Sequence, residues 1–380
     1  MAALYTATIL AGAFLLFLVE PMFARMLLPR LGGSPEVWNT AVVFYQVVLL
    51  LGYLYVHVGA SLLGMRRQAA LHVVLLAVAF LFLPVGVPAD LLPPAATSPA
   101  GWMLIVLVRR LGLPFFVLSA TSPLIQRWFA SLPHPAAKDP YFLYAASNVG
   151  SLLGLVVYPF LVEPNLRLVE QSGLWTGGYA VFAVLIAASA LVLRYRGERT
   201  VTSGRPSPVL GGAGIRWARR MRWLMVAAVP SSLMLSVTTY LSTDMPALPL
   251  MWIVPLALYL LTFVLAFSAR RLSSGRALSR LLVPLVLTIP LGTSLAGRIP
   301  VWFAIPMHLA GFFVAALACH RWLAEDRPAP DGLTEFYLWL SAGGALGGAF
   351  NTLVAPQVFS VPLEYPLGLA AAATILARLD

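Results

Sequence analysis

The stretch DPYFLYAASNVGSLLG, which runs from Asp139 to Gly154, decides the fold because the chain contains a second version of it. It has the apolar content of a membrane helix, yet it begins with an acid and a proline and carries Asn148 among apolar neighbours. The related segment follows 194 residues later without a gap. The matching pairs are Arg127 and Arg321, Trp128 and Trp322, Phe142 and Phe336, Ser147 and Ser341, Gly150 and Gly344, and Gly154 and Gly348. This repeat predicts two similar halves.

Composition sets the environment of the repeat. The chain has 380 residues, of which 60% are hydrophobic and only 10% are charged, and its mean hydropathy is +0.87. No soluble core needs that much apolar surface, so an all-α polytopic membrane protein is predicted. A membrane helix needs about 20 apolar residues. About twelve such spans are expected, at residues 3–23, 37–62, 70–86, 101–123, 141–162, 174–194, 223–243, 248–268, 281–297, 301–319, 336–355 and 361–377.

The charge pattern indicates topology and not nucleic-acid binding. The net charge is +11, but the basic residues are spread over short loops between apolar runs. Nineteen of the 25 fall on the side of the two chain ends and four on the other side. Cytoplasmic loops of membrane proteins carry such an excess of arginine and lysine. Both termini are therefore predicted to be cytoplasmic.

Three regions are predicted from the repeat and the spans. Residues 1–195 form an N-terminal six-helix half, 196–222 a basic cytoplasmic linker rich in Gly, Ser, Pro and Arg, and 223–380 a C-terminal six-helix half. A weaker match pairs Trp38 and Tyr45 with Trp252 and Tyr259. Two six-helix halves in the same orientation form a parallel repeat, as in the major facilitator superfamily (MFS).

Several motifs also resemble a known family. They are EPMFARMLLPRLGGSPEVWNT, GLPFFVLSATSPLIQRWFA, DPYFLYAASNVGSLLG, VPSSLMLSVTTYLSTD, LTEFYLWLSAGGALGGAFNTLVAP and LEYPLGL. Together they resemble the membrane portion of bacterial fused MFS/spermidine synthase-like proteins, over nearly the whole chain. The resemblance implies a multi-pass protein of the bacterial inner (plasma) membrane and a link to polyamines.

The enzymatic half of that family is not expected here. In such proteins a spermidine synthase-like domain with a Rossmann-type fold commonly follows the membrane part. This chain ends at Asp380, directly after the last predicted span, and has no Gly-rich strand-to-helix turn. We therefore expect no enzymatic activity and no cofactor. A soluble spermidine synthase-like or methyltransferase-like protein is a possible partner, beside the lipid bilayer.

Four acids near the outer ends of spans are the first candidate substrate ligands: Glu20, Glu163, Asp244 and Glu364. An acidic outer vestibule would attract a small cationic substrate. The alternative is that Glu20, Glu163 and Glu364 pair with Arg25, Arg30 or Arg167, or with backbone donors, and only fix helix ends.

Four amides inside predicted spans complete the candidate substrate site: Asn39, Gln46, Asn148 and Asn351. A buried amide needs hydrogen-bond partners, so each is expected to face the bundle interior. Contact with substrate is one role and a hydrogen bond between helices is the other. The same alternatives apply to the hydroxyl residues Ser231, Ser232, Thr238 and Thr239.

Repeated glycines predict close helix packing. They stand at the small-xxx-small spacing that lets two membrane helices approach closely. The candidates are Gly150, Gly154, Gly343, Gly344, Gly347 and Gly348.

Arg109 and Arg110 fall inside the fourth predicted span. Each arginine costs roughly 2.5–3.5 kcal/mol at the centre of a membrane helix on insertion scales. Either they line a cavity or meet an acid, or residues 99–108 lie along the interface and the true span starts near Leu111. No metal or catalytic site is predicted, because the five histidines lack ligand spacing and Cys319 is the only cysteine.

Two functions are compatible with these features. The first is a carrier that moves a small cationic metabolite, such as a polyamine, through a cavity near the bilayer midplane. The second is a membrane scaffold or anchor for a separately encoded spermidine synthase-like or methyltransferase-like enzyme.

Overall fold

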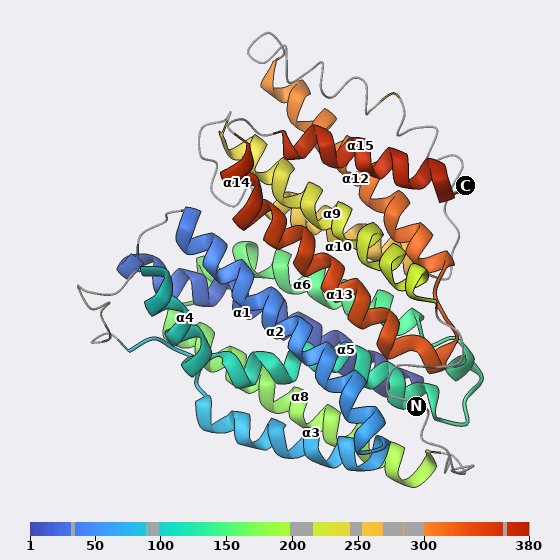
Figure 1. Ribbon diagram of the computed structural model, residues 1–380. Helices are drawn as coiled ribbons and strands as arrows, with labels where there is room; N and C mark the ends of the chain where they lie inside the picture. Colours follow the sequence, from blue (N-terminus) through green and yellow to red (C-terminus); the bar gives the residue numbers. More distant parts are fainter. Residues whose placement is uncertain are drawn as a thin grey trace. The chain divides into compact units, whose positions relative to one another are not determined.

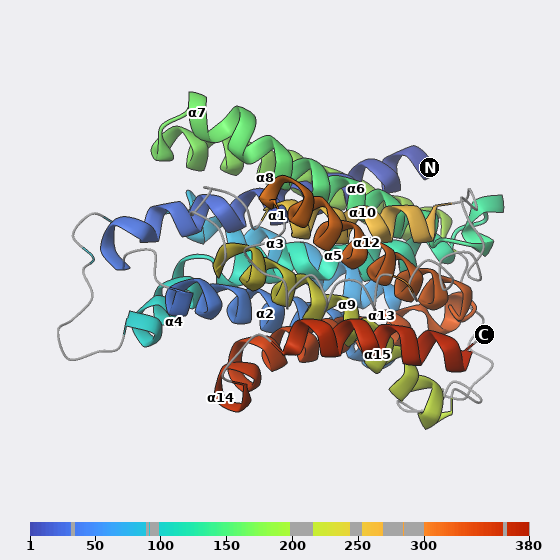
Figure 2. The same cartoon turned by 90° about the horizontal axis from the view of Figure 1, so that it is seen from above.

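The computed structural model describes residues 1–31, 35–88, 91, 99–197, 216–243, 253–268, 284, 300–359 and 363–379. These residues are mostly helical, without a β-strand among them, and short loops and turns join the helices (Figures 1 and 2). Most of the ninth predicted span, 281–297, lies outside the described residues.

The helices follow the apolar runs of the sequence. In the first part of the chain they are α1 (Ala2–Leu31), α2 (Pro35–Leu62), α3 (Met65–Ala79), α4 (Pro99–Arg110), α5 (Gly112–Ala130), α6 (Phe142–Val157), α7 (Glu163–Asn165) and α8 (Leu168–Arg196). The second part contains α9 (Trp217–Thr243), α10 (Ile253–Phe267), α12 (Val301–Glu325), α13 (Leu333–Ala349), α14 (Ala355–Val358) and α15 (Glu364–Leu379).

Eight helical segments among the described residues are long and apolar enough to cross a membrane. They correspond to the predicted spans that begin at residues 3, 37, 70, 141, 174, 223, 301 and 336. The pair α4–α5 makes a ninth if it is counted as one broken span. The prediction of an all-α polytopic membrane protein is therefore confirmed.

The contacts group the chain into two compact units. Unit 1 comprises Met1–Ile215 and Pro328–Leu338, and unit 2 comprises Arg216–Arg327 and Trp339–Asp380. The first turns of α13 therefore pack with unit 1 although they lie in the second half of the sequence. The predicted boundaries at residues 195 and 223 follow the duplication of the sequence and stay a prediction.

The fourth predicted span, 101–123, is not one straight helix. α4 ends at Arg110, α5 begins at Gly112, and the two axes differ by 70°. Pro114 explains the break, because a proline ring clashes with the carbonyl group four residues earlier, here that of Arg110. Arg109 and Arg110 are exposed at the end of α4. This geometry agrees with the alternative in which the span starts near Leu111.

Glycines allow the closest helix contacts in unit 1. A Cβ atom on Gly150 would overlap the backbone carbonyl oxygen of Leu10, and one on Gly154 would overlap that of Phe14. α1 and α6 therefore touch backbone to backbone. The space that a side chain would occupy at each glycine is filled by the other helix and not by lipid.

Unit 2 repeats this contact with a shift of one residue from the predicted match. Cβ atoms on Gly343 and Gly347 would overlap the carbonyl oxygens of Leu224 and Ala228 on α9. A Cβ on Gly344 would meet nothing within 4 Å. The counterparts of Gly150 and Gly154 are therefore Gly343 and Gly347. The ungapped sequence match pairs them instead with Gly344 and Gly348, because each glycine of the second half has a glycine neighbour that fits the sequence equally well.

Both of these helices end in the same way. α6 continues into a single π-helical turn, Tyr158–Val162, and α13 into another, Phe350–Val354. Short helices that carry a proline at their second residue, α7 and α14, follow directly. The duplication therefore extends to the backbone irregularities, which in membrane helices accompany proline and often mark functional positions.

The adjacent residues Gly343 and Gly344 allow a direct test of which glycine makes the contact with α9. Gly343→Ala should lower stability by about 1–3 kcal/mol, because the methyl group has no room against α9. Gly344→Ala should leave stability unchanged or raise it by up to about 1 kcal/mol, since alanine favours a helix and the site is open. Thermal unfolding in detergent measures both. If the two variants lose equal stability, Gly343 is not the glycine that makes the contact with α9.

Candidate functional site

Glu20 is an acid inside a membrane-spanning helix. It lies on α1 and is half-buried. Its carboxylate forms no ion pair or hydrogen bond with the part of the chain that the structure describes. Tyr45 on α2 approaches the same residue and donates its hydroxyl proton to the Glu20 backbone carbonyl at 3.4 Å. An ionisable residue in a span without a partner is a candidate for binding a substrate or ion.

Glu163, by contrast, is already paired. Its carboxylate accepts from Arg25 Nε at 3.2 Å, which ties α1 to the segment after α6. Arg30 donates to the backbone carbonyls of Met26 and Pro88 at 2.7 and 2.9 Å. The structure therefore gives Glu163 the alternative role, in which an acid fixes a helix end.

The backbone of Arg167 contacts a different acid, Glu170. The Arg167 N–H donates to the Glu170 carboxylate at 2.7 Å and so caps the start of α8. Of the acids predicted for the substrate, Glu364 lies half-buried in the first turn of α15. Asp244 lies outside the described residues.

Asn148 and Asn351 differ in how far their amides are used. The Asn351 oxygen accepts from Ser236 Oγ at 2.8 Å, and its Nδ2 donates to Ser232 Oγ at 2.5 Å and to the Gly347 carbonyl. Both ends of this amide therefore hold α9 and α13 together. This is the interhelical role of the two predicted for it.

Asn148 uses only one end of its amide. Its Nδ2 donates to the carbonyl of Tyr144, one turn earlier in α6, at 2.9 Å. Its oxygen accepts no hydrogen bond from the residues that the structure describes. Asn148 as a whole is 7% exposed, and its amide oxygen is not committed to a protein donor in the described residues. It is available for a ligand that donates hydrogen bonds.

The remaining predicted residues do not join this site. Gln46 is half-buried on α2, and no hydrogen bond connects it to Glu20 or Asn148 among the described residues. The backbone of Asn39 lies in α2, but its side chain is outside the described part. Ser231 donates to the Gly344 carbonyl at 2.8 Å, and Thr238 donates to Met234 in its own helix.

An aromatic cluster in unit 1 was missed at the sequence level. The Tyr337 hydroxyl, in the first turns of α13, donates to Gln126 Oε1 on α5 at 2.7 Å. Its ring centre lies 4.7 Å from that of Tyr144, 5.9 Å from that of Tyr141 and 6.5 Å from that of Tyr53. The four tyrosines come from three spans, and only Tyr141 and Tyr144 share one, so sequence spacing connects no more than that pair. Together they anchor the start of α13.

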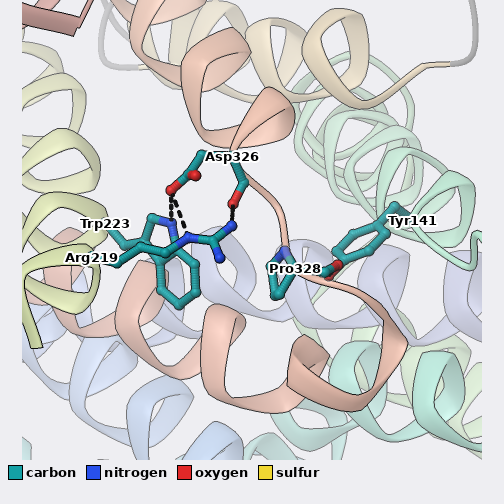
Figure 3. A network of polar contacts seen from close by, with 5 residues as sticks. All are labelled: Tyr141, Arg219, Trp223, Asp326 and Pro328. Carbon is teal, nitrogen blue, oxygen red and sulfur yellow. Dashed lines mark hydrogen bonds and ion pairs between the residues drawn. The ribbon is translucent and has the colours of Figure 1, made fainter. Parts of the chain in front are cut away.

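A charged network in unit 2 holds the ends of two helices. Asp326 ends α12, and its carboxylate accepts from Arg219 Nε at 3.1 Å and from Trp223 Nε1 at 2.7 Å (Figure 3). The Arg219 guanidinium also donates to the Asp326 carbonyl and lies 5.0 Å from the centre of the Trp223 ring. In unit 1, Tyr141 donates to the Pro328 carbonyl at 2.8 Å (Figure 3). These contacts are structural, because each polar group has its partner.

No family model matches the sequence, and no curated protein matches it. Solved structures do resemble it over its whole length. The human organic anion transporter MFSD10 (TETRAN) is 17% identical, with 100% of this chain and 99% of that chain covered at a TM-score of 0.63. The xylose transporter XylE from E. coli is 17% identical, with 99% and 97% covered at a TM-score of 0.57.

A third solved structure resembles the chain in the same way. The E. coli fucose:proton symporter FucP is 12% identical, with 98% of each chain covered and a TM-score of 0.53. At these identities the likeness concerns the fold alone. The chain therefore has the MFS fold, which confirms the predicted architecture of two similar six-helix halves in an all-α membrane protein.

The two asparagines should respond differently to mutation. Asn351→Ala should destabilise the protein by about 0.6–2 kcal/mol, because it removes hydrogen bonds between two membrane helices. Asn148→Ala should cost little, since it removes only a bond within one turn. Unfolding midpoints in the same detergent compare them. If Asn148→Ala lowered stability as much as Asn351→Ala, the view that the Asn148 amide makes no interhelical hydrogen bond would be contradicted.

Proposed function

We propose that the protein is a carrier of the MFS fold that moves a small cationic metabolite, such as a polyamine, across the bacterial inner membrane. The observation that carries the proposal is the half-buried Glu20 carboxylate in α1, which lacks a partner among the described residues. A substrate ammonium group would supply the missing charge. Nearby Tyr45 would add the face of an aromatic ring to the same binding site.

Asn148 would contribute a second contact. Its free amide oxygen can accept a hydrogen bond from an amine of the substrate. α1 and α6 run in the same direction, since Leu10 meets Gly150 and Phe14 meets Gly154. Asn148 is thus level with Thr8, about 18 Å from Glu20 along the axis at 1.5 Å per residue.

The bacterial inner membrane, the cytoplasmic termini and the relation to fused MFS/spermidine synthase-like proteins belong to the same proposal. They rest on the arginine distribution and on the quoted motifs. Exposed arginines stand at the beginnings of α3 and α9, at Arg66, Arg67 and Arg216. A basic cytoplasmic face of this kind also favours the alternative function, in which the protein anchors a separately encoded enzyme.

Transport by reconstituted protein tests the proposal. Purified protein in liposomes should take up radiolabelled spermidine above the level of empty liposomes. Glu20→Gln keeps the size of the side chain but removes its charge. We expect at least a tenfold lower initial rate, since loss of one partner of a buried charge pair costs about 2–5 kcal/mol.

The matched control is Glu325→Gln. Glu325 pairs with Arg321 at 3.5 Å, and its side chain is 61% exposed, so its charge should not affect transport. Failure of polyamines and of other small organic cations to enter, with folded protein in the liposomes, would exclude the proposed carrier function. Copurification of a soluble spermidine synthase-like enzyme would then support the anchor.

A further inference from the structure

A group of buried polar side chains surrounds His72 in unit 1 and belongs to none of the sites described above. Gln68 and His72 lie one turn apart on α3, and both are fully buried. The His72 ring stacks on Tyr55 of α2, with centres 6.0 Å apart. It meets the edge of Trp128 of α5 at 6.4 Å, and Trp128 is fully buried too.

These residues carry five polar atoms that find no partner in the described protein. They are Tyr55 Oη, Gln68 Oε1, His72 Nδ1, His72 Nε2 and Trp128 Nε1. Each of the other four histidines has a hydrogen bond at one ring nitrogen, to Thr334, Ala136, Tyr365 or Thr262. His72 has none at either nitrogen. A buried polar group without a partner costs about 1–3 kcal/mol, so such a concentration requires an explanation.

The orientation of Gln68 is fixed by its neighbours. Its Nε2 donates to the carbonyl of Val56 at 3.0 Å and to that of Tyr55 at 3.4 Å. Gly59 makes room for this amide on α2, since a Cβ there would come within 2.8 Å of Gln68 Nε2. Turning the amide over would aim its oxygen at two carbonyl oxygens. Oε1 therefore stays an acceptor without a partner.

The donors and acceptors are balanced and uncharged. Trp128 offers one donor and Gln68 one acceptor, a neutral imidazole offers one of each, and the Tyr55 hydroxyl offers both. None of these side chains is a carboxylate or a permanent cation, so the group does not suit a metal ion or an anion. Its ligand must both donate and accept while remaining neutral. Water does this, and a buried water typically makes about three such bonds.

We propose that His72, Gln68, Trp128 and Tyr55 bind at least one buried water molecule that links α2, α3 and α5. The water satisfies the Trp128 indole, the His72 ring and the Gln68 oxygen together. It gives the fully buried imidazole a hydrogen-bonded tautomer inside the membrane protein. The site does not depend on the proposed transport function.

Two tryptophans provide a matched comparison for a test. Trp128 and Trp175 are both fully buried in unit 1, but the Trp175 Nε1–H donates to the Leu15 carbonyl at 2.9 Å. Full-length protein labelled with ¹⁵N-tryptophan and ¹⁵N-histidine in lipid nanodiscs can be studied by water-edited solid-state NMR. Magnetisation should pass from water to the Trp128 indole and to a His72 nitrogen, and not to Trp175.

Variants then separate water binding from loss of fold. Trp128→Phe and Trp175→Phe assign the two indole signals. His72→Phe should reduce water transfer to Trp128 at least twofold, because the water loses a partner, while Trp175 keeps its signal. If His72→Phe does not fold, Gln68→Leu serves the same comparison. The proposal would be overturned if no magnetisation passed from water to the Trp128 indole in the unmodified protein. It would also be overturned if this transfer were unchanged in a folded His72→Phe or Gln68→Leu variant.

Discussion

Contact between backbones, made possible by missing side chains, is the constraint on which the two units depend. Lipid is as apolar as leucine, so burial alone does not hold one membrane helix against another. What distinguishes the α1–α6 and α9–α13 pairs is that glycine lets the carbonyl oxygens of one helix lie where a Cβ would stand on the other. Dispersion contacts then replace the hydrophobic effect as the source of association. Interhelical bonds such as Asn351 to Ser232 lie beside this contact and add to it.

Polar groups in the helices and at their ends fall into two classes, those that have a hydrogen-bond or ion-pair partner in the protein and those that do not. Arg25 and Glu163 complete each other, Asp326 is shared by Arg219 and Trp223, and both ends of the Asn351 amide are used. Glu20 and the oxygen of Asn148 remain without a protein partner in the described residues. A low-dielectric surrounding makes satisfied networks rigid and leaves unsatisfied groups ready for a ligand. A ligand would therefore bind at the unsatisfied groups.

Much of the fold was predictable from the sequence, but the partners of its polar residues were not. Apolar runs gave the helices because a span needs a minimum length, and the repeat indicated two halves. The shift from Gly344 to Gly343 escaped prediction because neighbouring glycines fit equally well in an ungapped comparison. Asn148 and Asn351 look alike in sequence, and their difference depends on serines of another helix. The group around His72 joins three helices, so no spacing along the chain reveals it.

Pro114 has an effect beyond the bend it causes. By ending α4 at Arg110, it determines which residue of the chain stands at the start of the next membrane segment. Both arginines are exposed at the end of α4, and neither lies in the middle of a helix, where the cost of inserting an arginine into the membrane is highest. The proline ring thus decides where one helix stops and the next begins.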